Sequence, residues 1–123
     1  MPGVPLIAIV DDDDALRTSL DDLIRSVGFR TQGFSSAEAF LSANQARDTA
    51  CLILDVQMPG MNGLELQRQL VANNWRIPII IITAHADNDA RARALAAGAV
   101  AFLYKPCREE ELLDAIDIAL KRS

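Results

Sequence analysis

Four short apolar runs and a fifth, weaker strand pattern at residues 29–34 alternate with amphipathic stretches along this chain, and this alternation restricts its fold more than any other feature of the sequence. The first run, Leu6–Val10, is continuously apolar, which is typical of a strand that is buried on both faces. The run over residues 77–83 gives the strongest strand pattern, because four isoleucines follow Pro78. The other predicted strands are residues 29–34, 51–56 and 99–104.

Apolar side chains at helical spacing fill the segments between the predicted strands. The first predicted helix has its apolar face from Leu16 to Val27, and Gly28 is placed to end it. The second begins with the capping-box spacing of Ser35 and Glu38 and continues to Asn44. The remaining helices are predicted over residues 64–74 with Asn62 as N-cap, over residues 87–97 before Gly98, and from Glu109 to the basic residues Lys121 and Arg122.

Strands that alternate with helices five times predict a parallel sheet with helices on both faces. Right-handed crossovers leave few topologies for such a chain. We expect a single-domain α/β fold, namely a flavodoxin-like, doubly wound, five-stranded parallel sheet of order 2-1-3-4-5 with five helices. The length of 123 residues suits one domain over residues 1–123, with an ordered core of about residues 5–122.

Charge and composition argue against several function classes. A net charge of −5 and an aromatic content of 5% do not suit nucleic-acid binding by this domain, which needs a basic face or a stacking platform. No segment is apolar over the length of a bilayer span, and the N-terminus lacks the basic region of a signal peptide, so we expect a cytoplasmic protein without membrane contact. Cys51 and Cys107 have no metal or redox spacing, and we expect both to be reduced.

Polar side chains follow the predicted strands at the ends where a doubly wound sheet binds its ligands. Asp11 and Asp12 follow the first strand and Asp55 lies at the end of the third. Thr83 ends the fourth strand and Lys105 follows the fifth. Because the carboxyl ends of parallel strands share one edge of the sheet, we expect acids, a hydroxyl and an amine to meet there.

The acidic run after the first strand has two interpretations. Paired carboxylates at the end of a buried strand repel each other, and Mg²⁺, which prefers oxygen ligands, would relieve that repulsion at Asp11 and Asp12. The alternative is a solvated loop leading to a helix N-cap, which is the interpretation we favour for Asp13 and Asp14. Both interpretations stay open for the first two residues.

Asp55 and Lys105 also have alternative interpretations. A strand-end Asp can simply cap a turn, but beside Mg²⁺ and a lysine its carboxylate becomes a nucleophile for a phosphoryl group, with Thr83 as a hydrogen-bond donor. Lys105 alone is a surface lysine, whereas a cis peptide bond to Pro106 would direct it inward. The sequence has no phosphate-binding glycine motif and no nucleophile elbow, so nucleotide binding and ester hydrolysis lack support.

Together, these residues resemble the receiver domains of two-component response regulators over nearly the whole chain. The motifs that carry the resemblance are residues 9–13, 54–63, 82–85 and 98–106. Each motif is weak alone, but their order and spacing are specific. Residues 36–41 and 83–85 are similar to those of the FixJ-like branch of receivers.

The resemblance implies a role for each matching residue. Asp55 would accept a phosphoryl group from a sensor histidine kinase in a Mg²⁺-dependent reaction, with Mn²⁺ as a candidate substitute. Asp12 would bind the metal directly and Asp11 largely through water, while Asp55 and the backbone carbonyl of Gln57 would supply further ligand oxygens. Lys105 would bridge to the phosphoryl group.

The resemblance also implies a two-state switch. Thr83 would rotate toward the phosphoryl group and Phe102 would follow into the space it leaves, which would change the surface of the fourth helix, fifth strand and fifth helix. From its spacing alone, Phe102 is a core residue. His85 lies where receivers tune access of the hydrolytic water, and its alternative is a solvated loop histidine. Cys107 departs from the phenylalanine that the family often has there, which affects loop packing but not the chemistry.

Such a domain is not a conventional turnover enzyme, although it would catalyse its own phosphorylation and slow dephosphorylation. Two other functions stay open: a degenerate receiver that only mediates protein contacts, and an aspartyl-nucleophile phosphohydrolase. The second is less favoured, because Gln57 stands where such enzymes place an acid–base Asp. Expected partners are the kinase, a linked or separate effector domain that controls transcription, and a second copy after phosphorylation. The sequence ends at Ser123, so we expect no effector domain within it.

Overall fold

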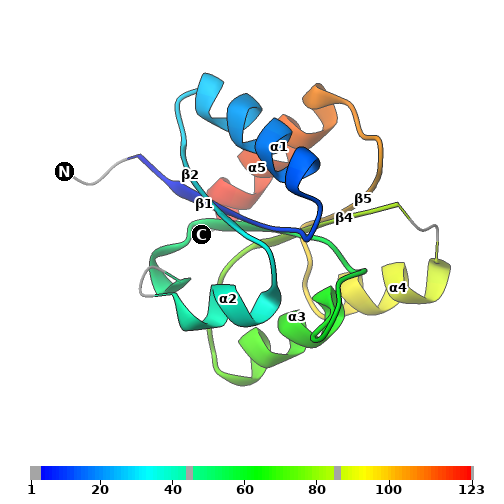
Figure 1. Ribbon diagram of the computed structural model, residues 1–123. Helices are drawn as coiled ribbons and strands as arrows, with labels where there is room; N and C mark the ends of the chain where they lie inside the picture. The colour runs from blue at the N-terminus through cyan, green and yellow to red at the C-terminus, as the bar shows by residue number, and fades with distance from the viewer. Residues whose placement is uncertain (1–3, 44–45, 85–86, 123) are drawn as a thin grey trace.

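A computed structural model describes residues 4–43, 46–84 and 87–122 of the protein (Figure 1). Over these residues, strands and α-helices alternate five times, with a short 3₁₀ helix at Ala46–Asp48. The strands are β1 (Leu6–Val10), β2 (Arg30–Phe34), β3 (Cys51–Leu54), β4 (Ile79–Thr83) and β5 (Ala101–Tyr104). The helices are α1 (Asp14–Ser26), α2 (Ala37–Ser42), α3 (Gly63–Ala72), α4 (Asn88–Ala96) and α5 (Glu109–Arg122).

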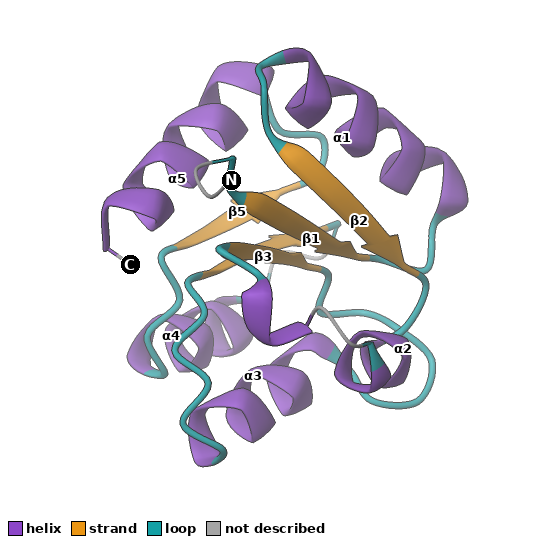
Figure 2. Ribbon diagram, turned by 90° about the vertical axis from the view of Figure 1, so that its left-hand side faces the viewer, coloured by secondary structure: helices purple, strands orange, loops and turns teal. Residues whose placement is uncertain are grey.

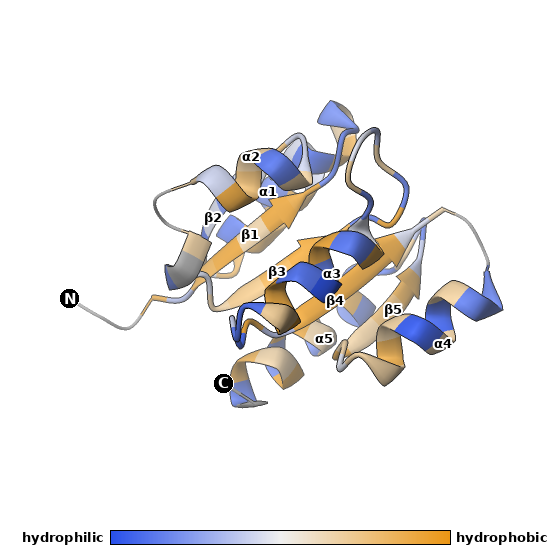
Figure 3. Cartoon of the chain, turned by 90° about the horizontal axis from the view of Figure 1, so that it is seen from below, coloured by the Kyte–Doolittle hydropathy of each residue, from blue (hydrophilic) through white to orange (hydrophobic). Residues whose placement is uncertain are grey.

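The five strands form one parallel sheet in the order β2-β1-β3-β4-β5. Helices α1 and α5 cover one face of this sheet, and α2, α3 and α4 cover the other (Figures 1 and 2). The central strands are apolar throughout, whereas the helices carry polar residues on their outer sides (Figure 3). The predicted flavodoxin-like, doubly wound fold is confirmed.

Alternate side chains of the strands enter two separate hydrophobic cores. Ile7 and Ile9 of β1 pack with Ile116 on the face covered by α1 and α5. Val10 packs with Phe40 on the face covered by α2, α3 and α4. Burial on both faces fixes the register of the strands, because a slip by one residue would exchange the two sets of side chains. The residues that follow each strand are therefore held at fixed positions along one edge.

Four strands are shorter than the sequence predicts. β4 begins at Ile79 rather than Ile77, because Pro78 has no N–H to donate to the sheet. The carbonyl of Pro78 still accepts a hydrogen bond from the Leu52 N–H at 2.9 Å. β3 is shorter at its end, and β2 and β5 are shorter at their starts. The polar residues after β3 accordingly lie in a loop.

Side-chain caps fix the starts of two helices near the strand ends, as predicted. Asp13 is the N-cap of α1 and accepts a hydrogen bond from the Leu16 N–H at 3.1 Å. Asn62 is the N-cap of α3 and forms a complete capping box with Glu65. Gly28 adopts a left-handed φ of 100° just after α1, which ends that helix. No helix within the described residues is long and apolar enough to cross a membrane.

The capping box predicted at Ser35 and Glu38 is wrong. The N-cap of α2 is Ser36, whose side chain accepts a hydrogen bond from the Ala39 N–H at 3.0 Å. Glu38 is exposed and accepts from the Met61 N–H at 3.1 Å instead. The loop after β3 lies against α2 and offers Glu38 this donor, so tertiary contact outweighs the local pattern. α2 ends at Ser42, and Asn44 lies outside the described residues.

Both cysteines are free thiols. Burial at the start of β3 raises the pKa of the Cys51 thiol to about 12. Cys107 is half-buried after β5, and burial, followed by the negative charge of Glu111, raises its pKa as well. Reactive cysteines have depressed pKa values, so neither thiol is activated.

Candidate functional site

The ends of four strands bring the predicted polar residues to one edge of the sheet. Asp11 follows β1, Asp55 follows β3, Thr83 ends β4 and Lys105 follows β5. Three of these are buried, with exposed fractions of 3% for Asp11, 5% for Asp55 and 1% for Thr83. Asp12, by contrast, is exposed. The predicted convergence of acids, hydroxyl and amine is thus present.

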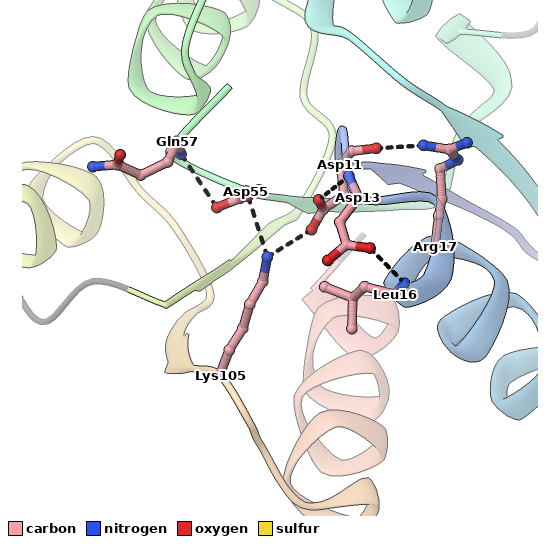
Figure 4. Close-up of polar contacts among 7 residues, drawn as sticks. All are labelled: Asp11, Asp13, Leu16, Arg17, Asp55, Gln57 and Lys105. Carbon is pink, nitrogen blue, oxygen red and sulfur yellow. Dashed lines mark hydrogen bonds and ion pairs between the residues drawn. The ribbon is translucent and has the colours of Figure 1, made fainter. Parts of the chain in front are cut away.

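Lys105 connects the two buried carboxylates (Figure 4). Its Nζ donates to Asp11 Oδ2 at 2.9 Å and to Asp55 Oδ2 at 3.2 Å. The peptide bond between Lys105 and Pro106 is cis, which sequence reasoning left undetermined. The lysine side chain points into the site and is only 19% exposed. The surface-lysine interpretation is therefore wrong for this residue.

The second oxygen of each buried carboxylate accepts a backbone hydrogen bond. Asp55 Oδ1 accepts from the Gln57 N–H at 3.2 Å, and Asp11 Oδ1 accepts from the Asp13 N–H at 2.9 Å. The side chain of Gln57 points away from Asp55 (Figure 4). Only the main chain of Gln57 therefore borders the site.

Backbone hydrogen bonds continue the sheet one residue beyond each of the strands that carry the site. The Asp11 N–H donates to the Phe34 carbonyl and the Asp55 N–H to the Val10 carbonyl, both at 3.1 Å. The Lys105 N–H donates to the Thr83 carbonyl at 2.7 Å. These residues are held by the sheet itself, so their side chains start from rigid positions.

Gly63 supports the site in a way that sequence reasoning missed. A Cβ at this position would lie 2.3 Å from the Asp55 carbonyl oxygen and 3.0 Å from the Val56 Cα. The absence of a side chain therefore lets α3 begin directly against the backbone of Asp55. A glycine as the first residue of a helix, where its propensity is poor, is the one local signal that could have indicated such a close approach.

Burial and charge shift the pKa values of the two central residues. Burial is the largest effect on Asp55 and raises its pKa. The hydrogen bond from the Gln57 N–H and the contact with Lys105 lower this pKa, whereas the negative charge of Asp11 raises it. The net shift of the Asp55 pKa is upward. Burial lowers the pKa of Lys105, but hydrogen bonding to Asp11 and the charges of both aspartates outweigh it, so that pKa is raised. Lys105 is thus charged at neutral pH, while the charge on Asp55 remains unfavourable and suits a further cation.

The aspartates fit a hard divalent cation by their chemistry and spacing. Asp11, Asp12 and Asp55 each offer a carboxylate oxygen, and these oxygens lie within 4.8 Å of one another. Lys105 neutralises one of the three carboxylates, which leaves two negative charges in the cluster. An all-oxygen donor set with one exposed member suits Mg²⁺, which keeps several of its waters.

The raised pKa of Asp55 predicts a stability difference between the wild type and an Asp55→Asn variant. Between the ordinary Asp pKa and the raised pKa, the native wild type binds more protons than the unfolded chain, so its stability falls as pH rises through that window. The variant lacks this titration. Urea unfolding of both metal-free proteins across this pH range should show the wild type losing stability relative to the variant as pH rises. A difference that is independent of pH would contradict the shift.

The two predicted switch residues lie on the same face of the sheet. Phe102 is buried in the core below α4, and its ring meets the Tyr104 ring edge-on at a centroid distance of 5.6 Å. Thr83 pairs in register with Tyr104, and Ile81 with Phe102. Because side chains alternate along strands, all of these point toward α4. His85 lies outside the described residues, so its predicted tuning role stays a prediction.

Comparison with known proteins places this geometry in a family. Residues 7–117 match the family described as the response regulator receiver domain. The response regulator protein TmoT of Ectopseudomonas mendocina is 50% identical over 94% of this chain and 53% of its own length. The transcriptional regulatory protein FixJ of Bradyrhizobium diazoefficiens is 38% identical over 95% of this chain and 57% of its own. The solved structure of the response regulator StyR matches with a TM-score of 0.90 and 45% identity, over 98% of this chain and 61% of that one.

The chain spans about half the length of the curated relatives it matches. What those whole proteins do therefore extends beyond the part that aligns with this chain. The aligned part contains every residue of the strand-end site, because the match covers residues 7–117.

Proposed function

Because the chain belongs to the response regulator receiver domain family, we propose that it is a phosphoryl-accepting signalling switch in which Asp55 is the acceptor. The observation that carries this proposal is the bridge from Lys105 Nζ to two buried carboxylates, with a third carboxylate within 4.8 Å. Such a constellation places a nucleophile beside a fixed positive charge and a site for a divalent cation. A site with that composition is suited to receiving a phosphoryl group.

The proposed donor is a phosphohistidine on a sensor histidine kinase. One carboxylate oxygen of Asp55 forms a bond to phosphorus as the bond from phosphorus to the imidazole nitrogen breaks. The imidazole leaves with that electron pair and takes up a proton. Lys105 would then donate to an oxygen of the bound phosphoryl group, which is a role its present contact with Asp55 prepares.

We propose Mg²⁺ as the resident cation, with Mn²⁺ as a substitute of similar coordination. Asp12 and Asp55 would bind it directly, Asp11 largely through water, and the Gln57 backbone carbonyl would add an oxygen. The cation supplies charge neutralisation to the phosphoryl oxygens when bound. The chain's own part is to hold the carboxylates in place through the backbone hydrogen bonds at Asp11 and Asp55.

The response to phosphorylation is proposed to be a repacking of Thr83 and Phe102. Thr83 would turn toward the phosphoryl group and Phe102 would move into the space it leaves. Supporting this, both residues face α4, whose buried residues are the small side chains Ala90 and Ala94. A helix with such shallow packing can shift at low cost. The changed surface would comprise α4, β5 and α5.

The output is proposed to be control of transcription through an effector domain, linked or separate, with a second phosphorylated copy as a further partner. One relative bears the name transcriptional regulatory protein. The domain would act in the cytoplasm without contacting nucleic acid itself. It would be its own phosphorylation catalyst rather than a turnover enzyme, because the exposed Gln57 has no acid–base group to offer a substrate.

A direct test is to incubate the protein with Mg²⁺ and a small phosphodonor such as acetyl phosphate and to measure its intact mass. The wild type should gain the mass of one phosphoryl group, and this adduct should be lost in alkali, as acyl phosphates are. The Asp55→Asn variant should gain none. An adduct that persists in this variant would place the acceptor elsewhere, and a wild type that gains none would favour the degenerate receiver. Sustained hydrolysis of a generic phosphate ester would favour the phosphohydrolase.

A further inference from the structure

Arg17 of α1 reaches across to the loop that follows β1. Its Nη1 donates to the backbone carbonyl of Asp11 at 2.7 Å (Figure 4). Its Nη2 also forms an ion pair with Asp14, one turn earlier on the helix. The Arg17 side chain is only 21% exposed, whereas that of Asp14 is 87% exposed. The better-buried contact is therefore the one to the Asp11 carbonyl.

The acceptor of this hydrogen bond matters because of its place in the chain. The Asp11 carbonyl belongs to the peptide unit whose nitrogen is that of Asp12. Fixing that carbonyl orients the peptide plane, and with it the N–Cα bond of Asp12, which restricts the directions that the Asp12 side chain can take. The Asp11 carboxylate constrains the same loop from the other side, by accepting from the Asp13 N–H at 2.9 Å. Two hydrogen bonds thus hold a loop that contains the exposed member of the aspartate cluster.

Gly33 of β2 leaves the space that Arg17 needs. A Cβ at Gly33 would lie 3.2 Å from Arg17 Cδ and 3.3 Å from Arg17 Cγ, which is closer than side chains normally pack. Gly33 pairs in register with Ile9, whose side chain packs on the face covered by α1. Glycine at this position therefore lets the arginine stem lie over the edge strand without the displacement that an added Cβ would require. Its φ is outside the left-handed range, so backbone conformation does not explain the glycine.

Arg17 is the first residue of a polar row on α1 that faces β2. One and two turns later, Asp21 and Arg25 also face β2, and both contact Thr31. Arg25 Nε donates to Thr31 Oγ1 at 2.8 Å and to Asp21 Oδ1 at 3.2 Å. These contacts join helix to strand and do not touch the aspartate loop. Arg25 is therefore a natural control for Arg17.

We propose that Arg17 is a positioning residue for cation binding. Its hydrogen bond holds the Asp11–Asp12 peptide in an orientation that allows a cation to bind, and the absence of a side chain at Gly33 leaves room for the Arg17 stem. This inference rests on the proposed function, since it assigns Arg17 to the same cation site. The direction in which the Mg²⁺ affinity changes when Arg17 is removed distinguishes positioning from a simple effect of charge. By charge alone, removing a cation near the aspartates should tighten Mg²⁺ binding. By positioning, removing it should weaken Mg²⁺ binding.

The experiment is calorimetric titration of Mg²⁺ into wild type, Arg17→Met, Gly33→Val, the double variant and Arg25→Met. Residues that orient metal ligands typically contribute 10-fold or more, so Arg17→Met should raise the Kd for Mg²⁺ about 10-fold. Gly33→Val should weaken binding with no change of charge, and the double variant should be no weaker than Arg17→Met alone, because both act through one hydrogen bond. Arg25→Met should leave the Kd unchanged.

Urea unfolding of the metal-free variants separates this role from a merely structural one. A loss of stability in Arg17→Met with an unchanged or lower Kd would overturn the inference, as would equal effects of the Arg17 and Arg25 variants. If Arg17→Met does not fold, weaker binding by Gly33→Val supports the inference and unchanged binding by it overturns the inference. A wild type that binds no Mg²⁺ would overturn the proposed cation site, and the inference with it.

Discussion

Replacing Lys105 with methionine should lower the free energy of unfolding of the metal-free protein by about 3 kcal/mol at neutral pH, near the lower end for breaking a buried ion pair. Methionine keeps the length of the side chain but removes the ammonium that donates to Asp11 and Asp55. Two carboxylates with side-chain exposures of only 4% and 6% would then face each other without a counter-charge. Urea unfolding in buffer with a chelator measures the difference.

The pH dependence of this loss identifies its cause. The native pKa of Lys105 is raised, so its stabilising contribution is fully present below the unfolded pKa and disappears as pH rises through the raised one. The difference between wild type and variant should therefore persist at neutral pH and shrink in alkali. It should also shrink in acid, because protonation of Asp55, whose pKa is raised, removes one of the repelling charges. A difference that is constant with pH would indicate lost packing instead.

Lys121 provides a matched control for the same substitution. Its Nζ lies 3.0 Å from Asp117 Oδ2, but the two side chains are 76% and 64% exposed. An exposed pair on a helix is worth about 0.3–0.5 kcal/mol, so Lys121→Met should change the stability by no more than this. Equal losses for Lys105→Met and Lys121→Met would contradict the assignment of Lys105 as the central counter-charge.

Mg²⁺ should act differently on the Lys105 variant. Without the ammonium, three negative charges surround the cation site instead of two, so Lys105→Met should bind Mg²⁺ more tightly than the wild type does. It should also accept a phosphoryl group more slowly, because the proposed contact from Lys105 to the phosphoryl oxygens is lost. Tighter binding with slower phosphorylation separates the charge-balancing part of Lys105 from its proposed part in transfer.

The sequence allowed the fold to be predicted because the three central strands, β1, β3 and β4, are apolar enough to require burial on both faces. Strand order and parallel pairing then place Asp11, Asp55 and Lys105 at one edge without any knowledge of their contacts. Periodicity does not indicate which of two adjacent polar residues is buried in the site and which is exposed. Asp11 and Asp12 are the same residue type in adjacent positions, yet only Asp11 is buried against Lys105. Burial depends on the direction of the loop, which is a property of the assembled fold.

Errors at the level of single residues have the same origin. Ser35 and Ser36 offer the same hydroxyl, and the helix begins after the second because Glu38 is engaged by the loop after β3. The hydrogen bond from Arg17 to the Asp11 carbonyl could not be predicted from the sequence either. The Arg17 side chain lies over Gly33 only when α1 and β2 are packed together. Contacts between segments that are distant along the chain decide these details.

Gly63→Ala should destabilise the protein by about 3 kcal/mol, at the upper end for an added methyl group in a packed site. The new Cβ would lie 2.3 Å from the Asp55 carbonyl oxygen, and that atom belongs to rigid backbone next to β3 rather than to a flexible side chain. Helix propensity alone predicts the opposite sign, since alanine is favoured over glycine in a helix by about 1 kcal/mol. Urea unfolding therefore decides between the two effects by the sign of the change.

Gly98→Ala is the matched control for this substitution. Gly98 follows α4 with a left-handed φ of 103°, and a Cβ there would meet nothing within 4 Å. Its cost should be the conformational one alone, about 1–2 kcal/mol. Because Gly63 lies against the backbone of Asp55, the proposed acceptor, Gly63→Ala should also slow phosphorylation by a small phosphodonor under conditions where the protein remains folded, whereas Gly98→Ala should not. A Gly63→Ala protein that is more stable than wild type and accepts phosphate at the normal rate would show that α3 does not hold Asp55 in place.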